Sequence, residues 1–194
     1  MLKQIILAVT GLVFSASLAA ASSYTIDPVH SQVHFTIPHL MVFKVRGDFS
    51  DFTGSVEFDA KNGKLTKTEA TIQIASLDTR EPKRDEHLKS PDFFAANQHP
   101  TMTFTSTKVE GNGSDMTVTG DLTIRGVTRE VTLKGGYQGS NTDPWGNERI
   151  GFAAETTINR HDYGLNWNKA LETGGVVVGE EVVIGLEIQA IKNK

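Results

Sequence analysis

The chain has 194 residues, with 23 Asp and Glu against 19 Lys and Arg, a net charge of −4 and no cysteine. This length suits a single domain with a sizeable core. The absence of cysteine excludes disulfides, thiolate zinc sites and cysteine nucleophiles. The acidic balance predicts no nucleic-acid partner, because phosphate contacts need a basic face.

The N-terminal residues predict export. Lys3 supplies a short positive region, residues 5–18 are mostly apolar or small, and Ala19–Ala21 offers a cleavage site. This pattern indicates a signal peptide over residues 1–21 and a mature domain over residues 22–194. A retained membrane anchor is the alternative, but the apolar stretch is short for a membrane span. We therefore expect a periplasmic protein with no stable membrane insertion after signal removal.

Beyond the signal, apolar and polar residues alternate with period 2, which is typical of half-buried strands. Turn residues such as Asn62-Gly63, Arg125-Gly126 and the 143–147 cluster separate the alternating segments. We expect eight long strands, near residues 33–37, 56–58, 71–74, 101–107, 118–124, 131–133, 152–158 and 182–188. No βαβ spacing is present, so an all-β antiparallel sandwich or barrel is favoured.

Three segments interrupt this pattern. Residues 81–89 have a proline near their start and no β-branched residue, which predicts a short helix. Residues 90–94 follow as a turn or a second short helical piece. Residues 38–43 form either another short helix or an irregular bend.

The usual catalytic signatures are missing. The sequence has no G-x-S-x-G elbow, no P-loop, no G-x-G-x-x-G after a strand and no H-E-x-x-H. His30 and His34 would lie roughly 13 Å apart on a strand, too far to share one metal ion. The sequence therefore predicts no catalytic residues, no metal site and no cofactor.

Several segments, spread in order over the whole mature chain, resemble the YceI family of exported, lipocalin-like proteins associated with polyisoprenoid binding. The matching segments are Tyr24–Ser31, Val45–Phe49, Asp78-Thr79, Arg84–Phe94, His99–Phe104, Gly120–Thr128, Asn159–Leu165 and Val178–Val182. The resemblance implies an eight-stranded antiparallel lipocalin-like barrel with a short helical insert. It also implies an elongated apolar pocket with a bound isoprenoid lipid, a quinone or pyrophosphate head group at the mouth, and a homodimer.

An eight-stranded barrel is just wide enough to be filled by side chains or to hold one small ligand. Periodicity alone does not decide between these two interiors. As pocket-wall candidates we take the bulky apolar residues Phe35, Ile37, Leu40, Phe43, Phe49, Phe93, Phe94, Phe104 and Phe152. Within this set, the segment 40–43 is apolar yet follows Pro38, and it is a candidate lid.

The polar members of the matching motifs, Arg46, Arg84, His30 and Asn159, are the candidates for binding a head group. Arg46 is favoured for an anionic or carbonyl head, because it precedes a glycine and lies between aromatic strands. The alternative for Arg84, with Asp85, is a capping or salt-bridge role that holds the helix on the barrel.

Three functions remain open at this point. The first is a binding or carrier protein for a long apolar lipid, a polyisoprenoid or isoprenoid quinone. The second is a stress-related structural protein with a packed barrel core and no ligand. The third is an enzyme that acts on a lipid inside the barrel.

Overall fold

The computed structural model describes residues 21–172 and 174–194, and these form mostly antiparallel strands. The strands are β1 (Ser22–Ile26), β2 (Gln32–His39), β3 (Phe43–Phe49), β4 (Phe52–Asp59), β5 (Lys64–Gln73), β6 (Leu77–Asp78), β7 (Thr101–Asn112), β8 (Asp115–Ile124), β9 (Val127–Thr142), β10 (Glu148–Asn159) and β11 (Glu181–Lys192). The helices are α1 (Pro82–Lys89) and the 3₁₀ turns η1 (Pro28–His30), η2 (Ile74–Ser76) and η3 (Arg160–Tyr163). Residues 1–20 of the expected signal peptide lie outside the described residues.

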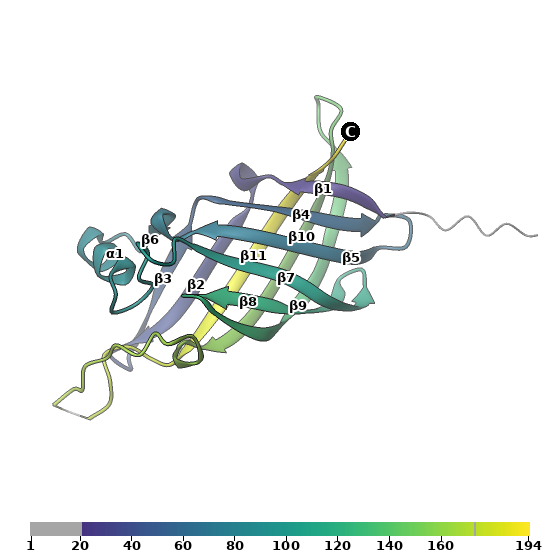
Figure 1. The fold of residues 1–194 in the computed structure, drawn as a ribbon. Helices are drawn as coiled ribbons and strands as arrows, with labels where there is room; N and C mark the ends of the chain where they lie inside the picture. Colours follow the sequence, from purple (N-terminus) through teal and green to yellow (C-terminus); the bar gives the residue numbers. More distant parts are fainter. Residues whose placement is uncertain (1–20, 173) are drawn as a thin grey trace, which may run out of the picture.

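The sheet closes on itself because β1 pairs with β4 on one side and with β11 on the other. The strand segments follow one another antiparallel around the ring (Figure 1). β1 and β2 both pair with β11 and together make one interrupted strand, and β3 with β4 and β5 with β6 make two more. The described strands therefore occupy eight positions, which confirms the predicted eight-stranded antiparallel barrel.

The eight alternating segments expected from the sequence fall one on each of these eight positions. What the alternation did not show is that three positions are broken. Between β1 and β2 the break follows from Pro28, which lacks the N–H that a ladder needs, and from Asp27, whose side chain accepts a hydrogen bond from Val29 N.

The helical expectations had mixed outcomes. The helix expected at 81–89 is α1, with Pro82 in its first turn and the Glu81 side chain capping the backbone N–H of Lys83. The helix considered for 38–43 is wrong, because this segment is the turn of the β2–β3 hairpin. Leu40 and Met41 adopt positive φ there, as the central residues of a type I′ turn do, and Val42 N donates to the His39 carbonyl at 3.2 Å.

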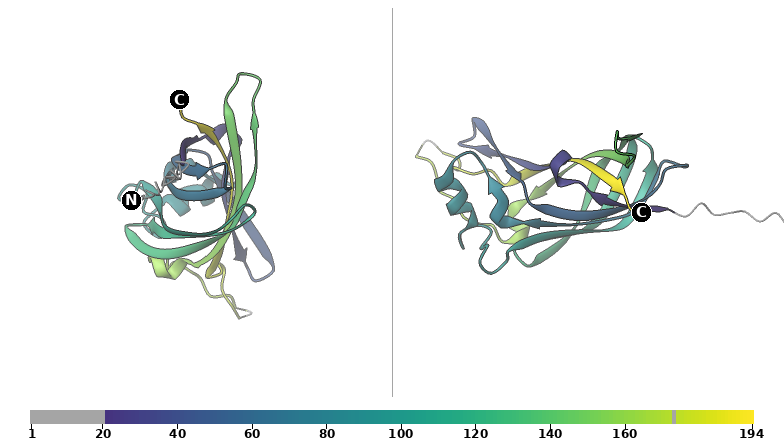
Figure 2. Two further views of the ribbon diagram at one scale, coloured as in Figure 1. Left: turned by 90° about the vertical axis from the view of Figure 1, so that its right-hand side faces the viewer. Right: turned by 90° about the horizontal axis from the view of Figure 1, so that it is seen from above.

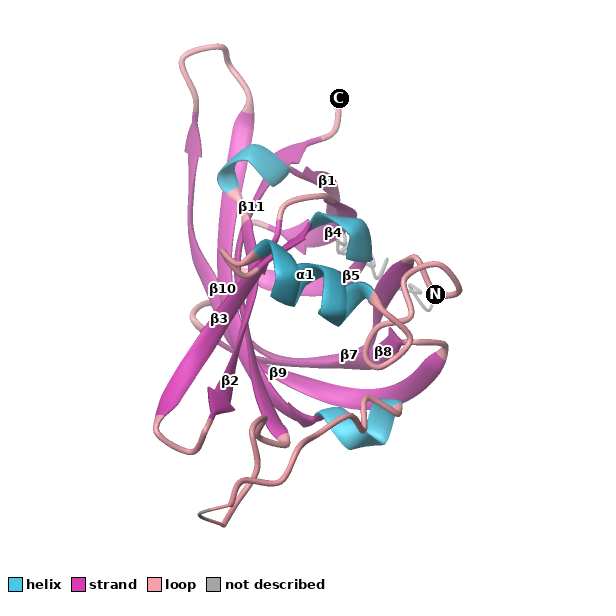
Figure 3. Cartoon of the chain, turned by 90° about the vertical axis from the view of Figure 1, so that its left-hand side faces the viewer, coloured by secondary structure: helices cyan, strands magenta, loops and turns pink. Residues whose placement is uncertain are grey.

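The two ends of the barrel differ. At one end α1, the β2–β3 hairpin and the segments 160–172 and 174–180 gather, and we call this the helix-covered end (Figures 1 and 2). Figure 3 looks onto it, with α1 lying across the end of the barrel. The other end carries the β4–β5 and β7–β8 hairpins and the start of β1, and we call it the closed end. Over the described residues, no helix is both long and apolar enough to cross a bilayer.

Candidate functional site

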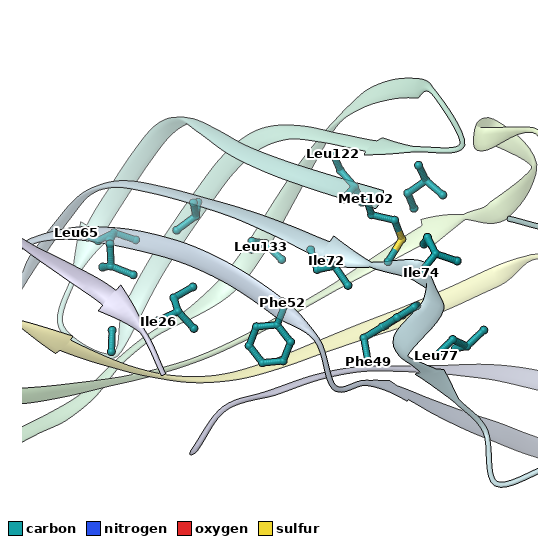
Figure 4. Close-up of a cluster of buried hydrophobic side chains, with 14 of the residues drawn as sticks. Ile26, Phe49, Phe52, Leu65, Ile72, Ile74, Leu77, Met102, Leu122 and Leu133 are labelled. Atoms are coloured by element: carbon teal, nitrogen blue, oxygen red, sulfur yellow. The ribbon is translucent and has the colours of Figure 1, made fainter. Parts of the chain in front are cut away.

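The barrel encloses a cavity of about 380 Å³. Its wall is made by inward side chains from almost every strand, and Figure 4 shows a group of them converging on the interior. On β8 the lining extends from Met116 to Ile124, which is roughly 26 Å at about 3.3 Å per residue. Packed cores leave few voids larger than a water molecule. The interior is therefore an elongated cavity within the size range of ligand pockets.

Two aromatic rings of the wall lie close to glycines of the neighbouring strand. A Cβ on Gly47 would stand 2.4 Å from the ring of Phe35, and one on Gly120 would stand 2.6 Å from the ring of Phe104. The absence of a side chain at each glycine leaves space for the ring against the strand backbone. The two rings therefore pack against strand backbone where they form part of the cavity wall.

The closed end is filled by aromatic side chains. The centroid of the Phe58 ring lies 4.8 Å from the ring centroid of Tyr137 and 5.3 Å from that of Phe152. Fully buried Tyr24 lies in the same core and donates its hydroxyl hydrogen to Glu148 at 2.6 Å. Burial and this carboxylate raise the pKa of Tyr24. The one polar atom that Tyr24 carries into this end is therefore satisfied.

The helix-covered end combines aromatic and charged side chains. His87 of α1 packs edge-on against Trp167 with ring centroids 4.8 Å apart, and Phe93 lies 5.3 Å from the same indole. All three line the cavity, as do Arg84 and Arg160. The lining contains no Asp or Glu among the described residues, so its only permanent charges are two guanidinium groups.

Arg84 is tethered at the start of α1. Its Nε donates to Thr79 Oγ1 and its Nη2 donates to the Thr79 carbonyl, both at 2.7 Å. Asp85 Oδ1 in turn accepts hydrogen bonds from the Thr79 backbone N–H and hydroxyl. The Arg84-Asp85 pair thus fixes the helix to the strand before it, and the Arg84 side chain also faces the cavity.

Arg160 is the more deeply buried of the two, with 3% of the residue exposed. Its Nε donates to the Gly179 carbonyl at 2.8 Å and its Nη1 donates to the Leu165 carbonyl. Its Nη2 has no hydrogen-bond partner in the described part of the chain. Burial lowers the pKa of this guanidinium.

The position of Arg160 follows from the turn that holds it. Asn159 caps η3 by accepting a hydrogen bond from the His161 backbone N–H at 2.9 Å. Gly164 ends η3 in the left-handed conformation, φ 74°, which glycine adopts at little cost. Asn159 and Gly164 therefore shape the backbone, and Arg160 carries the charge into the cavity.

Eight of the thirteen residues that the sequence singled out line the cavity. They are Phe35, Ile37, Phe49, Phe93, Phe94, Phe104, Phe152 and Arg84. Their contact with a ligand stays a prediction. The structure brings them to one surface from strands, α1 and the segment after it.

The other five residues are not part of the cavity lining. Leu40 and Phe43 lie at the exposed β2–β3 hairpin tip, where Phe43 is 78% exposed. The hairpin tip nevertheless contacts the cavity lining, because Leu40 N donates to the carbonyl of lining residue Val177 at 2.9 Å. Asn159, as described, is a helix cap.

Arg46, the favoured head-group candidate, points away from the cavity. Its neighbour Val45 faces inward, so Arg46 lies on the outer face of β3 and donates to Asp48 and Gln32. His30 also lies outside, where its Nδ1 is 2.8 Å from an Asp27 carboxylate oxygen.

Sequence reasoning passed over Arg160, although one signal would have found it. The inward residues of β10 are 152, 154, 156 and 158, which all line the cavity. Continuing this period of two by one step reaches residue 160. The capping Asn159 was chosen instead because both residues lie in the same motif and polarity alone does not separate them.

Comparison with known proteins places this barrel in a family. The YceI-like domain matches residues 24–190 of the 194-residue chain. The chain belongs to the YceI-like domain family. A YceI protein of Escherichia coli O17:K52:H18 is 39% identical over 197 residues and is matched over the full length of both chains.

Solved structures of YceI-like proteins share the fold. The crystal structure of the Campylobacter jejuni YCEI protein has a TM-score of 0.71 and 31% identity, covering 81% of this chain and 90% of its own. A polyisoprenoid binding domain from Saccharophagus degradans has a TM-score of 0.63 and 17% identity, covering 89% of this chain and 99% of its own. At that identity the second comparison bears on the fold alone.

Proposed function

We propose that this protein is a periplasmic binding or carrier protein for one long apolar lipid, a polyisoprenoid or isoprenoid quinone, held inside the barrel. The observation that carries the proposal is the cavity of about 380 Å³, whose lining runs along the barrel and is overwhelmingly apolar. A structural protein with a packed core would fill this space with side chains.

The energetics favour a chain-like ligand. Each buried methylene contributes roughly 0.8 kcal/mol, so about fifteen carbons contribute roughly 12 kcal/mol. Association costs about 4–15 kcal/mol in lost translational and rotational freedom. A tail of about fifteen carbons therefore contributes a free energy of the same size as this cost. A long narrow cavity lets a single chain bury its carbons in series.

Two further observations support the proposal. A barrel of the same fold is a polyisoprenoid binding domain in Saccharophagus degradans. The signal-peptide pattern of residues 1–21 supports export to the periplasm.

The experiment is to express the full chain, purify the exported protein and analyse its organic extract by mass spectrometry. We expect one long-chain lipid in near-equimolar amount. The variant Ala154→Phe places a ring in the cavity wall and should lose this lipid, whereas Ala60→Phe, in the exposed turn after β4, should keep it. An extract without lipid, from folded protein that also takes up no added prenyl lipid, would contradict the proposal.

A further inference from the structure

We propose that Arg160 binds an anionic oxygen of the ligand head group, so that the preferred ligand is a long apolar chain ending in a carboxylate or phosphate. This inference rests on the proposed lipid-binding function and adds the chemistry and orientation of the ligand. It is carried by the burial of Arg160, by its unpartnered Nη2 and by the charge of the lining.

Burial of the Arg160 guanidinium costs free energy. A buried charge is expensive unless it is paired and hydrogen-bonded. Arg160 is 3% exposed, and the two groups that accept from it are neutral backbone carbonyls of Gly179 and Leu165. It makes no ion pair within the described residues, and Glu180 acts on it only as a charge at a distance. Among the described residues, the positive charge therefore has no acidic group in contact with it.

A counter-charge for Arg160 can come from a ligand in the cavity. Arg160 lines the cavity, and its Nη2 is buried without a protein acceptor among the described residues. An anionic oxygen brought into the cavity would supply both an acceptor for the Nη2 hydrogens and the missing negative charge. A neutral hydroxyl or carbonyl would supply only the acceptor, and charge-assisted hydrogen bonds are the stronger kind.

The charged side chains of the cavity lining are all positive among the described residues. Arg84 adds a second positive charge, and no lining residue in the described chain is acidic. An anionic head is therefore attracted to this cavity, and a cationic head is repelled. Each arginine donates two of its nitrogens to the protein, but only Arg160 keeps a buried nitrogen, Nη2, with no acceptor among the described residues. Arg160 is therefore the residue with an unused donor for a ligand.

The positions of the charged residues set the orientation of the ligand along the barrel. Arg160, Arg84 and Trp167 belong to the helix-covered end, where α1 and the segment after η3 meet through the His87–Trp167 contact. Toward the closed end the wall is formed by residues such as Val56, Leu65 and Met116. The head group therefore lies at the helix-covered end and the tail points toward the closed end.

The test compares chains that differ only in their heads, measured as dissociation constants for the delipidated protein at neutral pH. The probes are farnesyl phosphate, farnesol and farnesylamine, with hexadecanoate and hexadecanol as a second pair that separates carboxylate from phosphate recognition. We expect each anion to bind at least about tenfold more tightly than its alcohol, and the amine to bind most weakly.

The variant Arg160→Met should remove the preference for the anion and leave the affinity for farnesol nearly unchanged. Arg125→Met is the matched control, because Arg125 bonds to the Gly164 carbonyl at the end of η3 but does not line the cavity. It should keep the full preference. If Arg160→Met fails to fold, the ranking of the heads on the unaltered protein still decides.

Equal affinities for anion and alcohol, or a preference that survives Arg160→Met, would overturn this inference alone. Uptake of none of the chains would overturn the proposed function and this inference with it. A preference for farnesyl phosphate without one for hexadecanoate would restrict the head to phosphate, and the reverse result would restrict it to carboxylate.

Discussion

The two ends of the barrel differ in how they pair a buried polar side chain. These side chains are Tyr24 at the closed end and Arg160 at the helix-covered end. At the closed end the Tyr24 hydroxyl donates to Glu148, which also accepts from Lys192 at 2.9 Å. At the helix-covered end Arg160 Nη2 has no acceptor in the described part of the chain. Buried polar groups in proteins are almost always paired, so the closed end satisfies its own polar group, and the helix-covered end fits the ligand site proposed above.

The largest expected effect is on the stability of the closed end. Phe58 is 0% exposed and packs against two other rings, so Phe58→Ala should lower the free energy of unfolding by about 3–5 kcal/mol. Urea denaturation measures it. A loss below about 1 kcal/mol would show that the closed end contributes little to stability and would remove the contrast between the ends.

An intermediate effect is expected along the wall between the ends. In Gly47→Ala the new Cβ would stand 2.4 Å from the Phe35 ring, so the ring must move. We expect a loss of about 1–3 kcal/mol from overpacking together with weaker lipid uptake. Thermal unfolding and a farnesol titration report the two effects. Gly151→Ala is the control, because its backbone is not in the positive-φ region and a Cβ there meets its nearest atom at 3.7 Å, an ordinary contact; unchanged stability and uptake in Gly47→Ala would contradict the role given to the Phe35 ring.

A smaller effect, dependent on pH, is expected outside the cavity near the closed end. Hydrogen bonds from Asn147 and Arg149 hold the pKa of Asp143 well below its ordinary value. The stability from this carboxylate is therefore fully present above about pH 4, the ordinary pKa of Asp, and is lost as the pH falls through the lowered folded-state pKa.

Asp143→Asn should consequently lower the melting temperature at pH 7 and reduce the loss of stability below pH 4. Melting curves between pH 7 and pH 2 measure both. The ion pair of Arg149 with Asp27, at 2.6 Å, stays in place as an internal reference. An unchanged acid profile would show that Asp143 does not contribute to the pH dependence.

The smallest effect is expected at the hairpin tip of the helix-covered end. Phe43 is 78% exposed, so Phe43→Ala should change the free energy of unfolding by no more than about 0.5 kcal/mol. It is the matched control for Phe58→Ala, since the chemical change is identical. A loss comparable with that of Phe58 would mean that the tip is covered in solution.

The alternation predicted an antiparallel sandwich or barrel, because segments such as 152–158 and 182–188 place their apolar side chains on one face. Both arrangements bury such faces, and the choice of an eight-stranded barrel came from the resemblance to the YceI family. The β2–β3 turn was predicted only as one of two alternatives, an irregular bend or a short helix, because Leu40 and Met41 are not typical turn-forming residues. Their conformation is supported by a bond to Val177, more than a hundred residues away in the chain.

The candidate site was predicted only in its apolar part. Phe35 and Phe104 could be chosen from their alternation, but the glycines that hold their rings lie on other strands and are matched only by the register. Arg46 and Arg160 are both motif arginines beside a strand residue. Arg46 lies on the outer face of β3, whereas Arg160 lies in η3, directly after β10, and lines the cavity. Residue type and motif membership do not separate the two.

The most direct test of the account is the orientation of a bound chain. The probes are stearate with a nitroxide label at carbon 5, near the head, or at carbon 16, near the tail end. One protein variant carries Trp145→Phe, leaving cavity-lining Trp167 as the sole tryptophan, and a second carries Trp145→Phe, Trp167→Phe and Phe152→Trp to report from the closed end. We predict stronger quenching of Trp167 fluorescence by the carbon-5 label and the opposite order in the Phe152→Trp variant. Equal quenching in both proteins, or the reverse order, would contradict a lipid held with its head at Arg160.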